Sequence, residues 1–195
     1  MKSFKIALAQ FSPEIGNTEA NVEKMLQQAN EAKKQNADII VFPELSTIGY
    51  PAEDLILRPS LIKRTEKAFK ELAKIKDIVL VFGFVNQTED GQRHNAAAVM
   101  KDGQILGIYN KQNLPNYGVF DEKRYFNEGY QHLVFEYLGH KFGVLICEDV
   151  WSLSTVQQIA QLNVETALVL NASPYEVGKP QHRVATMSEL AKQMN

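Results

Sequence analysis

Apolar runs of strand length alternate with amphipathic segments of helix length along this chain. Between residues 19 and 35 the apolar side chains recur at the i, i+3, i+4, i+7 spacing of a helix, and residues 60–76 carry a similar stripe. Continuous apolar runs such as 38–42 and 78–85 are typical of buried strands. This alternation predicts a mixed α/β sheet protein. The expected strands cover residues 5–11, 38–42, 78–85, 95–100, 105–109, 133–138, 142–146 and 167–170.

Two Asp-Gly pairs predict hairpins in the middle of the chain. Asp90-Gly91 lies between the runs 78–85 and 95–100, and Asp102-Gly103 lies between 95–100 and 105–109. The favoured two-residue hairpin turn needs a positive φ at both central residues, which is why Asp-Gly is a strong signal.

Two longer segments, 43–59 and 111–130, are expected to be loops. The second is long for a compact domain, and its aromatic side chains indicate that it is packed and functional. Further helices are expected from Ser152 to about Leu162 and from Pro180 or Gln181 onward.

The composition is that of one globular domain, and it narrows the possible functions. The chain has 195 residues, 45% hydrophobic and 23% charged, with a formal net charge of -2 at pH 7. It therefore offers no basic excess for nucleic-acid binding. The apolar start is interrupted at Gln10 without a cleavage motif, and no run reaches the ~18 apolar residues of a membrane span. Cys147 is the one cysteine, so a reducing compartment, the cytoplasm, is expected.

Glu44, Lys111 and Cys147 each lie within two residues of the end of a predicted strand, in Pro43-Glu44, Asn110-Lys111 and Cys147-Glu148-Asp149. Sites in α/β proteins form at the carboxyl ends of strands, so these side chains are expected to meet. A cysteine thiolate is a nucleophile, a carboxylate accepts the thiol proton, and an ammonium group stabilises an oxyanion. Together they would open an amide by acyl transfer without a histidine.

Each of these three residues also has a structural interpretation. Cys147 at the end of an apolar strand would be a small buried hydrophobic side chain. Glu44 would be solvated or would cap a helix, and Lys111 would be a surface charge. Spacing alone leaves these alternatives open.

Several motifs carry a family resemblance over nearly the whole chain. Phe42-Pro43-Glu44-Leu45, Lys111 with Asn113-Leu114, and Cys147-Glu148-Asp149-Val150-Trp151 resemble the nitrilase superfamily of carbon–nitrogen hydrolases. Residues 49–55, 114–126 and 171–175 are similar to the glutaminase domain of bacterial glutamine-dependent NAD+ synthetases.

The resemblance implies an α/β fold, a nitrilase-like αββα sandwich of mixed sheets flanked by helices, with a Glu–Lys–Cys triad. Cys147 would be the nucleophile that forms a glutamyl thioester, Glu44 the general base, and Lys111 the group that holds the intermediate. Glu122 falls where the family has a second glutamate near the lysine. Its alternative is a solvated charge in a charged loop.

The resemblance also implies contacts to a glutamine substrate. Tyr117 would line the pocket, with packing inside the loop as its alternative. Glu148 would offer its N–H to the oxyanion and its carboxylate to the substrate amino group, provided that the strand has ended before it. Ser173 and Lys179 would contact the charged backbone groups of glutamine. Related sequences often have arginine at position 179, whose bidentate fork lysine lacks, so Arg183 is a rival.

Family members continue beyond the position of Asn195. The resemblance implies further strands that complete the second sheet, and then a synthetase domain that uses ATP and Mg2+ to amidate deamido-NAD+ to NAD+. Neither a Gly-x-x-x-x-Gly-Lys loop nor a Ser-Gly-Gly motif occurs in this sequence. We therefore expect residues 1–195 to be a truncated glutaminase domain, with its C-terminal part and the synthetase domain absent.

The expected function is that of the glutaminase part of such an enzyme. It would hydrolyse L-glutamine to glutamate and ammonia, and pass the ammonia to the synthetase domain in cis. Expected partners are L-glutamine, that domain and further copies of the chain in a homo-oligomer, with neither nucleic acid nor membrane. No metal or cofactor is expected in this part, because the histidines lack metal-ligand spacing. The alternatives are a free-standing amidase for another small amide and a non-catalytic fragment that assists assembly or regulation.

Overall fold

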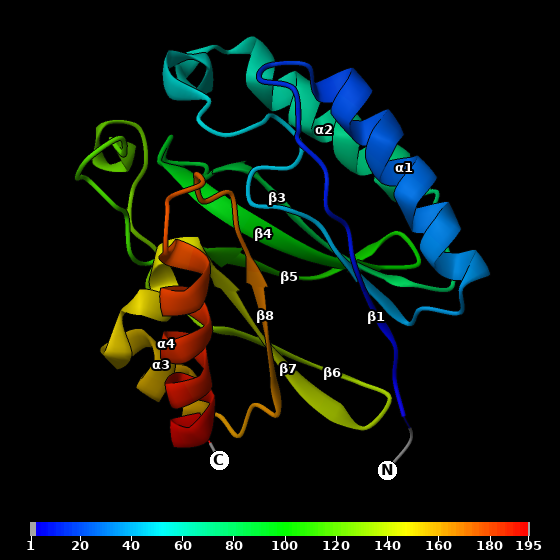
Figure 1. Ribbon diagram of the computed structural model, residues 1–195. Coiled ribbons are helices and arrows are strands. Elements are labelled where there is room, and N and C mark those ends of the chain that lie inside the picture. The colour runs from blue at the N-terminus through cyan, green and yellow to red at the C-terminus, as the bar shows by residue number, and fades with distance from the viewer. Residues whose placement is uncertain (1–2, 195) are drawn as a thin grey trace.

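A computed structural model describes residues 3–194 as two sheets that face each other, with helices outside them (Figure 1). The layers follow the expected α/β arrangement. In chain order the elements are β1 (Ile6–Leu8), α1 (Thr18–Lys34), β2 (Ile39–Val41), the short 3-10 helix η1 (Glu53–Leu57), α2 (Ser60–Leu72), β3 (Val79–Gln87), β4 (Arg93–Lys101), β5 (Gln104–Asn110), η2 (Glu122–Arg124), β6 (Leu133–Tyr137), β7 (His140–Ile146), η3 (Cys147–Trp151), α3 (Leu153–Ala160), β8 (Thr166–Leu170) and α4 (Lys179–Met194).

The first sheet has the strand order β1-β2-β3-β4-β5. β1, β2 and β3 are parallel, and β3, β4 and β5 form two successive antiparallel hairpins. Both hairpins predicted from the Asp-Gly pairs are therefore confirmed. The predicted first strand, 5–11, is too long, since β1 pairs only over the three residues that β2 offers it.

The second sheet has the order β6-β7-β8, with β6 and β7 antiparallel and β7 and β8 parallel. The parallel step from β7 to β8 passes through η3 and α3. Ile146, the last residue of β7, pairs with Leu170, the last residue of β8. The loops after these two strands therefore leave the sheet side by side.

A continuous apolar core fills the space between the sheets. It joins inward side chains of the first sheet, such as Val81 and Val99, to those of the second, such as Phe142 and Val144. A second cluster lies on the outer face of the first sheet, where α1 and α2 cover β2, β3 and β4. Burial of these apolar surfaces is the main stabilising contribution, at roughly 25 cal/mol per Å².

Helix α1 follows from local sequence signals. The Asn17 side chain caps it by accepting a hydrogen bond from the Ala20 N–H at 3.3 Å, which satisfies one of the free donors of the first turn. Val22, Met25 and Ala29 form the predicted buried stripe, which faces the outer cluster of the first sheet. The predicted helix 60–76 ends earlier than expected, at Leu72.

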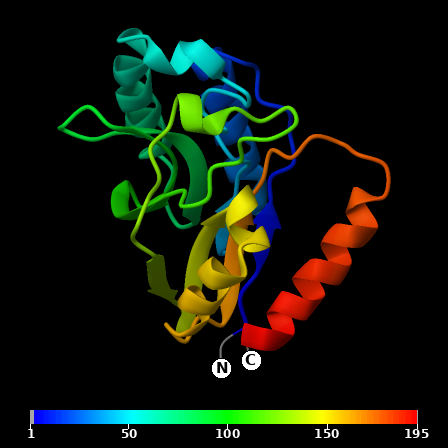
Figure 2. The ribbon, with the colours of Figure 1, turned by 90° about the vertical axis from the view of Figure 1, so that its left-hand side faces the viewer.

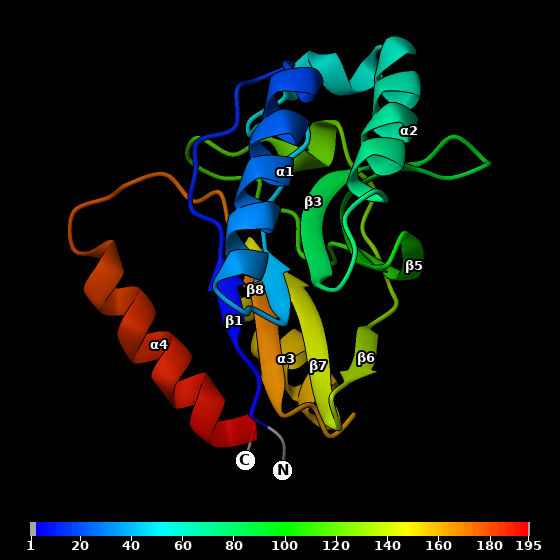
Figure 3. The ribbon, with the colours of Figure 1, turned by 90° about the vertical axis from the view of Figure 1, so that its right-hand side faces the viewer.

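Helices α3 and α4 flank the second sheet in different ways. Ile159 of α3 is fully buried and packs beside Gly143 of β7, where an added Cβ would lie 2.6 Å from it. Helix α4 follows a long connection, packs against α3 and contacts the core between the sheets through the partly buried Met187 (Figures 2 and 3). Within residues 179–192 no side chain is buried. Over residues 3–194, the helices are too short or too polar to cross a membrane.

Candidate active site

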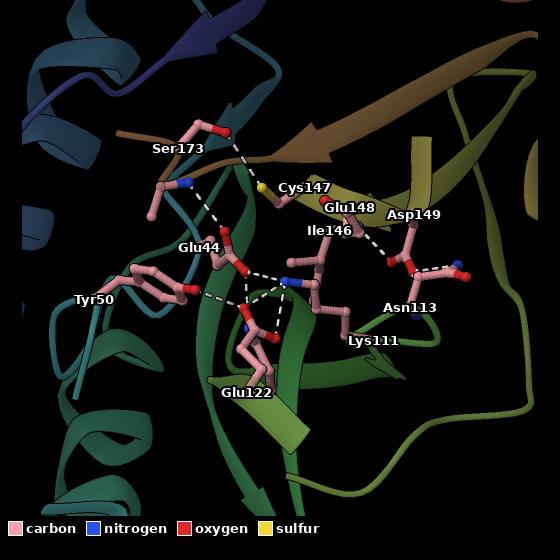
Figure 4. A network of polar contacts seen from close by, with 12 residues as sticks. Glu44, Tyr50, Lys111, Asn113, Glu122, Ile146, Cys147, Glu148, Asp149 and Ser173 are labelled. Atoms are coloured by element: carbon pink, nitrogen blue, oxygen red, sulfur yellow. Dashed lines mark hydrogen bonds and ion pairs between the residues drawn. The ribbon is translucent and has the colours of Figure 1, made fainter. Parts of the chain in front are cut away.

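Three buried polar side chains converge where strands of the two sheets end (Figure 4). Glu44 follows β2, Lys111 follows β5, and Cys147 opens η3 directly after β7. Their exposed fractions are 1%, 0% and 5%. The structure thus excludes a solvated Glu44 and a surface Lys111. The strand-end argument correctly places both with the thiol.

Lys111 is shared between two carboxylates. Its Nζ lies 2.7 Å from Oε1 of Glu44 and 2.8 and 3.0 Å from the two carboxylate oxygens of Glu122. Burial alone would lower the pKa of the Lys111 ammonium, but the attraction of Glu44 and Glu122 outweighs it and raises the pKa above its ordinary value. Lys111 therefore stays protonated and carries a positive charge that could stabilise an oxyanion.

Glu122 is brought to the site by η2, which folds the loop 111–130 back onto Lys111. Its Oε1 also accepts a hydrogen bond from the Tyr50 hydroxyl at 2.8 Å. Burial and repulsion from Glu44 raise the pKa of Glu122 to about 7, although Lys111 opposes the shift. Since Glu122 is 4% exposed, its alternative as a solvated charge is wrong.

Glu44 is held by donors other than Lys111. Its Oε1 accepts a hydrogen bond from the Asn95 side-chain amide at 2.8 Å, and its Oε2 accepts one from the Ala172 N–H at 3.0 Å. The loop that carries Glu44 runs directly over Gly83 of β3. A Cβ at position 83 would lie 2.2 Å from the backbone nitrogen of Leu45. Only glycine allows this approach.

Cys147 is held in a backbone conformation that is uncommon for its residue type. Its φ is +45°, in the left-handed region. Its Sγ lies 3.4 Å from the Ser173 hydroxyl. Burial and the nearby Glu44 carboxylate raise the pKa of the thiol to about 12, although Lys111 opposes them. The resting group is therefore a neutral thiol, which needs a base before it can attack a carbonyl carbon.

A pocket of about 510 Å³ borders the thiol. The four residues predicted to contact the substrate line this pocket: Tyr117, Glu148, Ser173 and Lys179. The Tyr117 hydroxyl donates to the Glu148 carboxylate, with oxygen–oxygen distances of 3.0 and 3.1 Å. The other walls of the pocket are formed by Phe120, Trp151, residues 176–178 and His182.

The condition set for Glu148 is met, because β7 ends at Ile146 and Glu148 lies in η3. Lys179 and Arg183, the two candidates for binding the glutamine carboxylate, lie at different pockets. Lys179 lines the pocket beside Cys147 and pairs with Glu176 at 3.7 Å. Arg183 instead lines a second pocket, of about 610 Å³, whose lining also includes Leu8 of β1, Glu44 and Ser173.

Three contributors to the site were missed by the sequence analysis: Tyr50, Asn95 and Asp149. Tyr50 lies in the motif 49–55, which was noted only for its resemblance. Asn95 supports Glu44 with its side chain and accepts the Lys111 N–H with its carbonyl oxygen at 2.8 Å. A buried asparagine at the start of an apolar run was the available signal.

Among residues 3–194, no cluster of three or more histidine, cysteine or acidic side chains is arranged to hold a metal.

The family comparison agrees with this geometry. Residues 5–193 match the carbon–nitrogen hydrolase family. The chain belongs to the carbon–nitrogen hydrolases. It is 75% identical over 195 residues to the glutamine-dependent NAD(+) synthetase of Acinetobacter baylyi. The expected nitrilase-like α/β fold and the expected amide-hydrolase class are therefore confirmed.

Solved structures place this hydrolase in the same group. A glutamine-dependent NAD+ synthetase from Acinetobacter baumannii superposes with a TM-score of 0.98 at 76% identity, covering 100% of this chain and 37% of that one. An amidase from Nesterenkonia sp. superposes with a TM-score of 0.82 at 26% identity, covering 91% of this chain and 68% of that one. The chain spans 36% of the length of the Acinetobacter baylyi relative.

Proposed function

We propose that this hydrolase domain is a glutaminase that releases ammonia from L-glutamine through a thioester on Cys147. The single observation that carries the proposal is the Lys111 ammonium held between the buried Glu44 and Glu122 carboxylates. The similarity to glutamine-dependent NAD+ synthetases supports glutamine as the amide.

In the proposed acylation step, the Glu44 carboxylate takes the proton of the Cys147 thiol. The sulfur then attacks the side-chain amide carbon of glutamine. Negative charge develops on the carbonyl oxygen, where the Lys111 ammonium and the Glu148 backbone N–H would stabilise it. Glu44 returns the proton to the nitrogen, the carbon–nitrogen bond breaks, and ammonia leaves.

In the proposed deacylation step, Glu44 takes a proton from a water molecule that attacks the thioester carbon. The carbon–sulfur bond breaks, glutamate leaves, and the proton returns to the sulfur. Both steps use only groups of this chain and a water molecule, so the proposal needs no cofactor. Glu122 would hold Lys111 in place through its two hydrogen bonds.

Substrate recognition is assigned to the pocket beside the thiol. Tyr117 and Glu148 would face the substrate amino group, and Ser173 and Lys179 the carboxylate and backbone. The location of Lys179 in this pocket supports it over Arg183. As a point charge, lysine would bind the carboxylate without a bidentate fork.

We further propose that the ammonia serves a synthetase domain, in cis or as a partner, which would use ATP and Mg2+ to convert deamido-NAD+ to NAD+. The relatives that span the whole of this chain carry the name of that synthetase. Three expectations stay predictions: a shortened domain over residues 1–195, self-association of the chain, and a cytoplasmic location.

A second candidate is an amidase that acts on another small amide. The similarity to the Nesterenkonia amidase favours it, since that protein shares the fold without being a synthetase by name. The pocket residues Tyr117 and Glu148 argue for an amino-acid amide, because the pocket that they line also contains Lys179 and so offers both a carboxylate and an ammonium group.

The deciding experiment measures ammonia release from L-glutamine and from a panel of small amides. The parent chain is expected to release ammonia from glutamine, and Cys147→Ala to release none while its circular dichroism spectrum stays unchanged. Faster turnover of another amide than of glutamine would favour the second candidate. Release by Cys147→Ala would remove the thioester route, and a folded parent that turns over no amide would favour the non-catalytic alternative.

A further inference from the structure

The Asp149 carboxylate is fully buried, and five donors from two parts of the chain surround it. Its Oδ1 accepts from the backbone N–H groups of Gln112 and Asn113 at 3.1 and 2.8 Å and from the Asn113 side chain at 3.0 Å. Its Oδ2 accepts from the Tyr109 hydroxyl at 2.8 Å and the Ile146 N–H at 3.0 Å.

These partners flank the two reactive residues. Gln112 and Asn113 come directly after Lys111, and Ile146 comes directly before Cys147. Asp149 itself lies in η3, the short helix that Cys147 opens. One carboxylate therefore connects the end of β5 in the first sheet to the end of β7 in the second (Figure 4).

The Cys147 turn needs such support because its backbone is strained. A non-glycine residue in the left-handed region is strained, and it persists only where the surroundings fix it. The Ile146 N–H bond to Asp149 closes this turn from the side opposite the thiol. Loss of that bond would free the turn to relax.

We propose that Asp149 is a positioning residue, which fixes the Cys147 thiol relative to the Lys111 ammonium and thereby sets the rate of attack. This inference rests on the proposed role of Cys147 as the nucleophile. Asp149 touches neither the pocket nor the thiol, and it acts through the backbone on either side of the reactive residues.

An amide of the same shape cannot replace the carboxylate. If the side-chain oxygen in Asp149→Asn faced Gln112 and Asn113, the new NH2 group would face the Ile146 N–H, and two donors would oppose each other. If the amide were flipped, two backbone N–H groups would lose their acceptor. Either orientation leaves a buried donor unsatisfied, and burying such a donor without a partner is unfavourable.

The test compares Asp149→Asn with Asp38→Asn, the same chemical change at the opposite end of the first sheet, where the Asp38 carboxylate accepts the Lys5 N–H. The first readout is the rate at which 2-chloroacetamide alkylates Cys147, the one thiol of the chain, followed by intact mass. This readout does not require glutamine to be the substrate. The second is the split between kcat and KM for glutamine.

In folded Asp149→Asn, alkylation is expected to slow by about tenfold or more, and kcat to fall by about tenfold with KM within about threefold of the parent. Asp38→Asn is expected to stay within about twofold on both readouts. Parental or faster alkylation in folded Asp149→Asn would overturn the proposal, as would a change confined to KM. If alkylation is slow in Asp149→Asn and the parent chain does not hydrolyse glutamine, the proposed substrate would be overturned and the positioning role would stand.

Tyr109→Phe provides the answer if Asp149→Asn does not fold. It removes one of the five donors and keeps the backbone contacts. Alkylation slowed by about threefold or more in the folded variant would support the positioning role. An alkylation rate equal to that of the parent would overturn it.

Discussion

Lys111 binds Glu122 through both carboxylate oxygens, while it contacts Glu44 through one. The ammonium is thus the shared counter-ion of two buried acids. Removing one partner of a buried ion pair leaves an uncompensated charge, which destabilises by about 3–5 kcal/mol. The stability of the fold and the chemistry of the site therefore depend on the same group.

Lys111→Met is expected to lower the free energy of unfolding by about 3 kcal/mol or more, because it leaves two buried carboxylates without their counter-ion. Urea denaturation followed by circular dichroism measures it. Adding Glu122→Gln to this variant is expected to restore part of the loss, because one of the two unpaired charges is then gone. A loss below about 1 kcal/mol in the single variant would contradict the buried pairing.

Lys111→Arg is expected to fold and to lose nearly all ammonia release. The guanidinium keeps the positive charge, but its planar fork is larger than an ammonium in a space closed to solvent, and it cannot direct one donor at the oxyanion position. Steady-state turnover of glutamine measures the effect. Full turnover by this variant would show that the site needs only a charge at position 111.

Glu122→Gln is expected to change how stability depends on pH. The pKa of Glu122 is about 7 in the folded chain against a model-peptide value of 4.5, so the folded state binds the proton more tightly. Its contribution to stability is present below pH 4.5 and is lost as pH rises through about 7. The unfolding free energy of the parent minus that of the variant should therefore fall over this window, by on the order of 3 kcal/mol. A difference that stays flat or rises with pH would be inconsistent with a raised pKa.

Lys179→Ala is expected to raise the KM for glutamine by about tenfold with a smaller effect on kcat, because it removes a cation from the pocket beside the thiol. Arg183→Ala is the matched control, since it removes a cation from the neighbouring pocket. Its KM should stay within about twofold of the parent. The reverse result would assign the substrate carboxylate to Arg183.

The sequence predicts the local elements well, for physical reasons that act within a few residues. The stripe of Val22, Met25 and Ala29 has helical spacing, and the Asp102-Gly103 pair defines a hairpin between β4 and β5. Strand ends are less predictable. β1 stops where its partner stops, which depends on pairing that its own sequence does not contain.

The site was predictable where one residue follows one strand, as for Lys111 and Cys147. It was not predictable where a contact depends on the pairing of strands or on a loop. Asn95 lies in β4, which pairs with β3 on one side and with β5 on the other, and this arrangement brings its side chain to Glu44. Glu122 reaches Lys111 because η2 turns the loop back, and only the family resemblance indicated that contact. The placement of α4, which has no buried side chain within residues 179–192, follows no pattern in its sequence.

The close approach at Gly83 bears on how sequences of this kind are classified. A chain that keeps Glu44, Lys111 and Cys147 but has acquired any side chain at position 83 would push the Glu44 loop off the sheet. Such a chain would look competent by its reactive residues and yet be a pseudoenzyme. In genome surveys, an inconspicuous glycine in the middle of a strand would therefore separate active members from inactive ones.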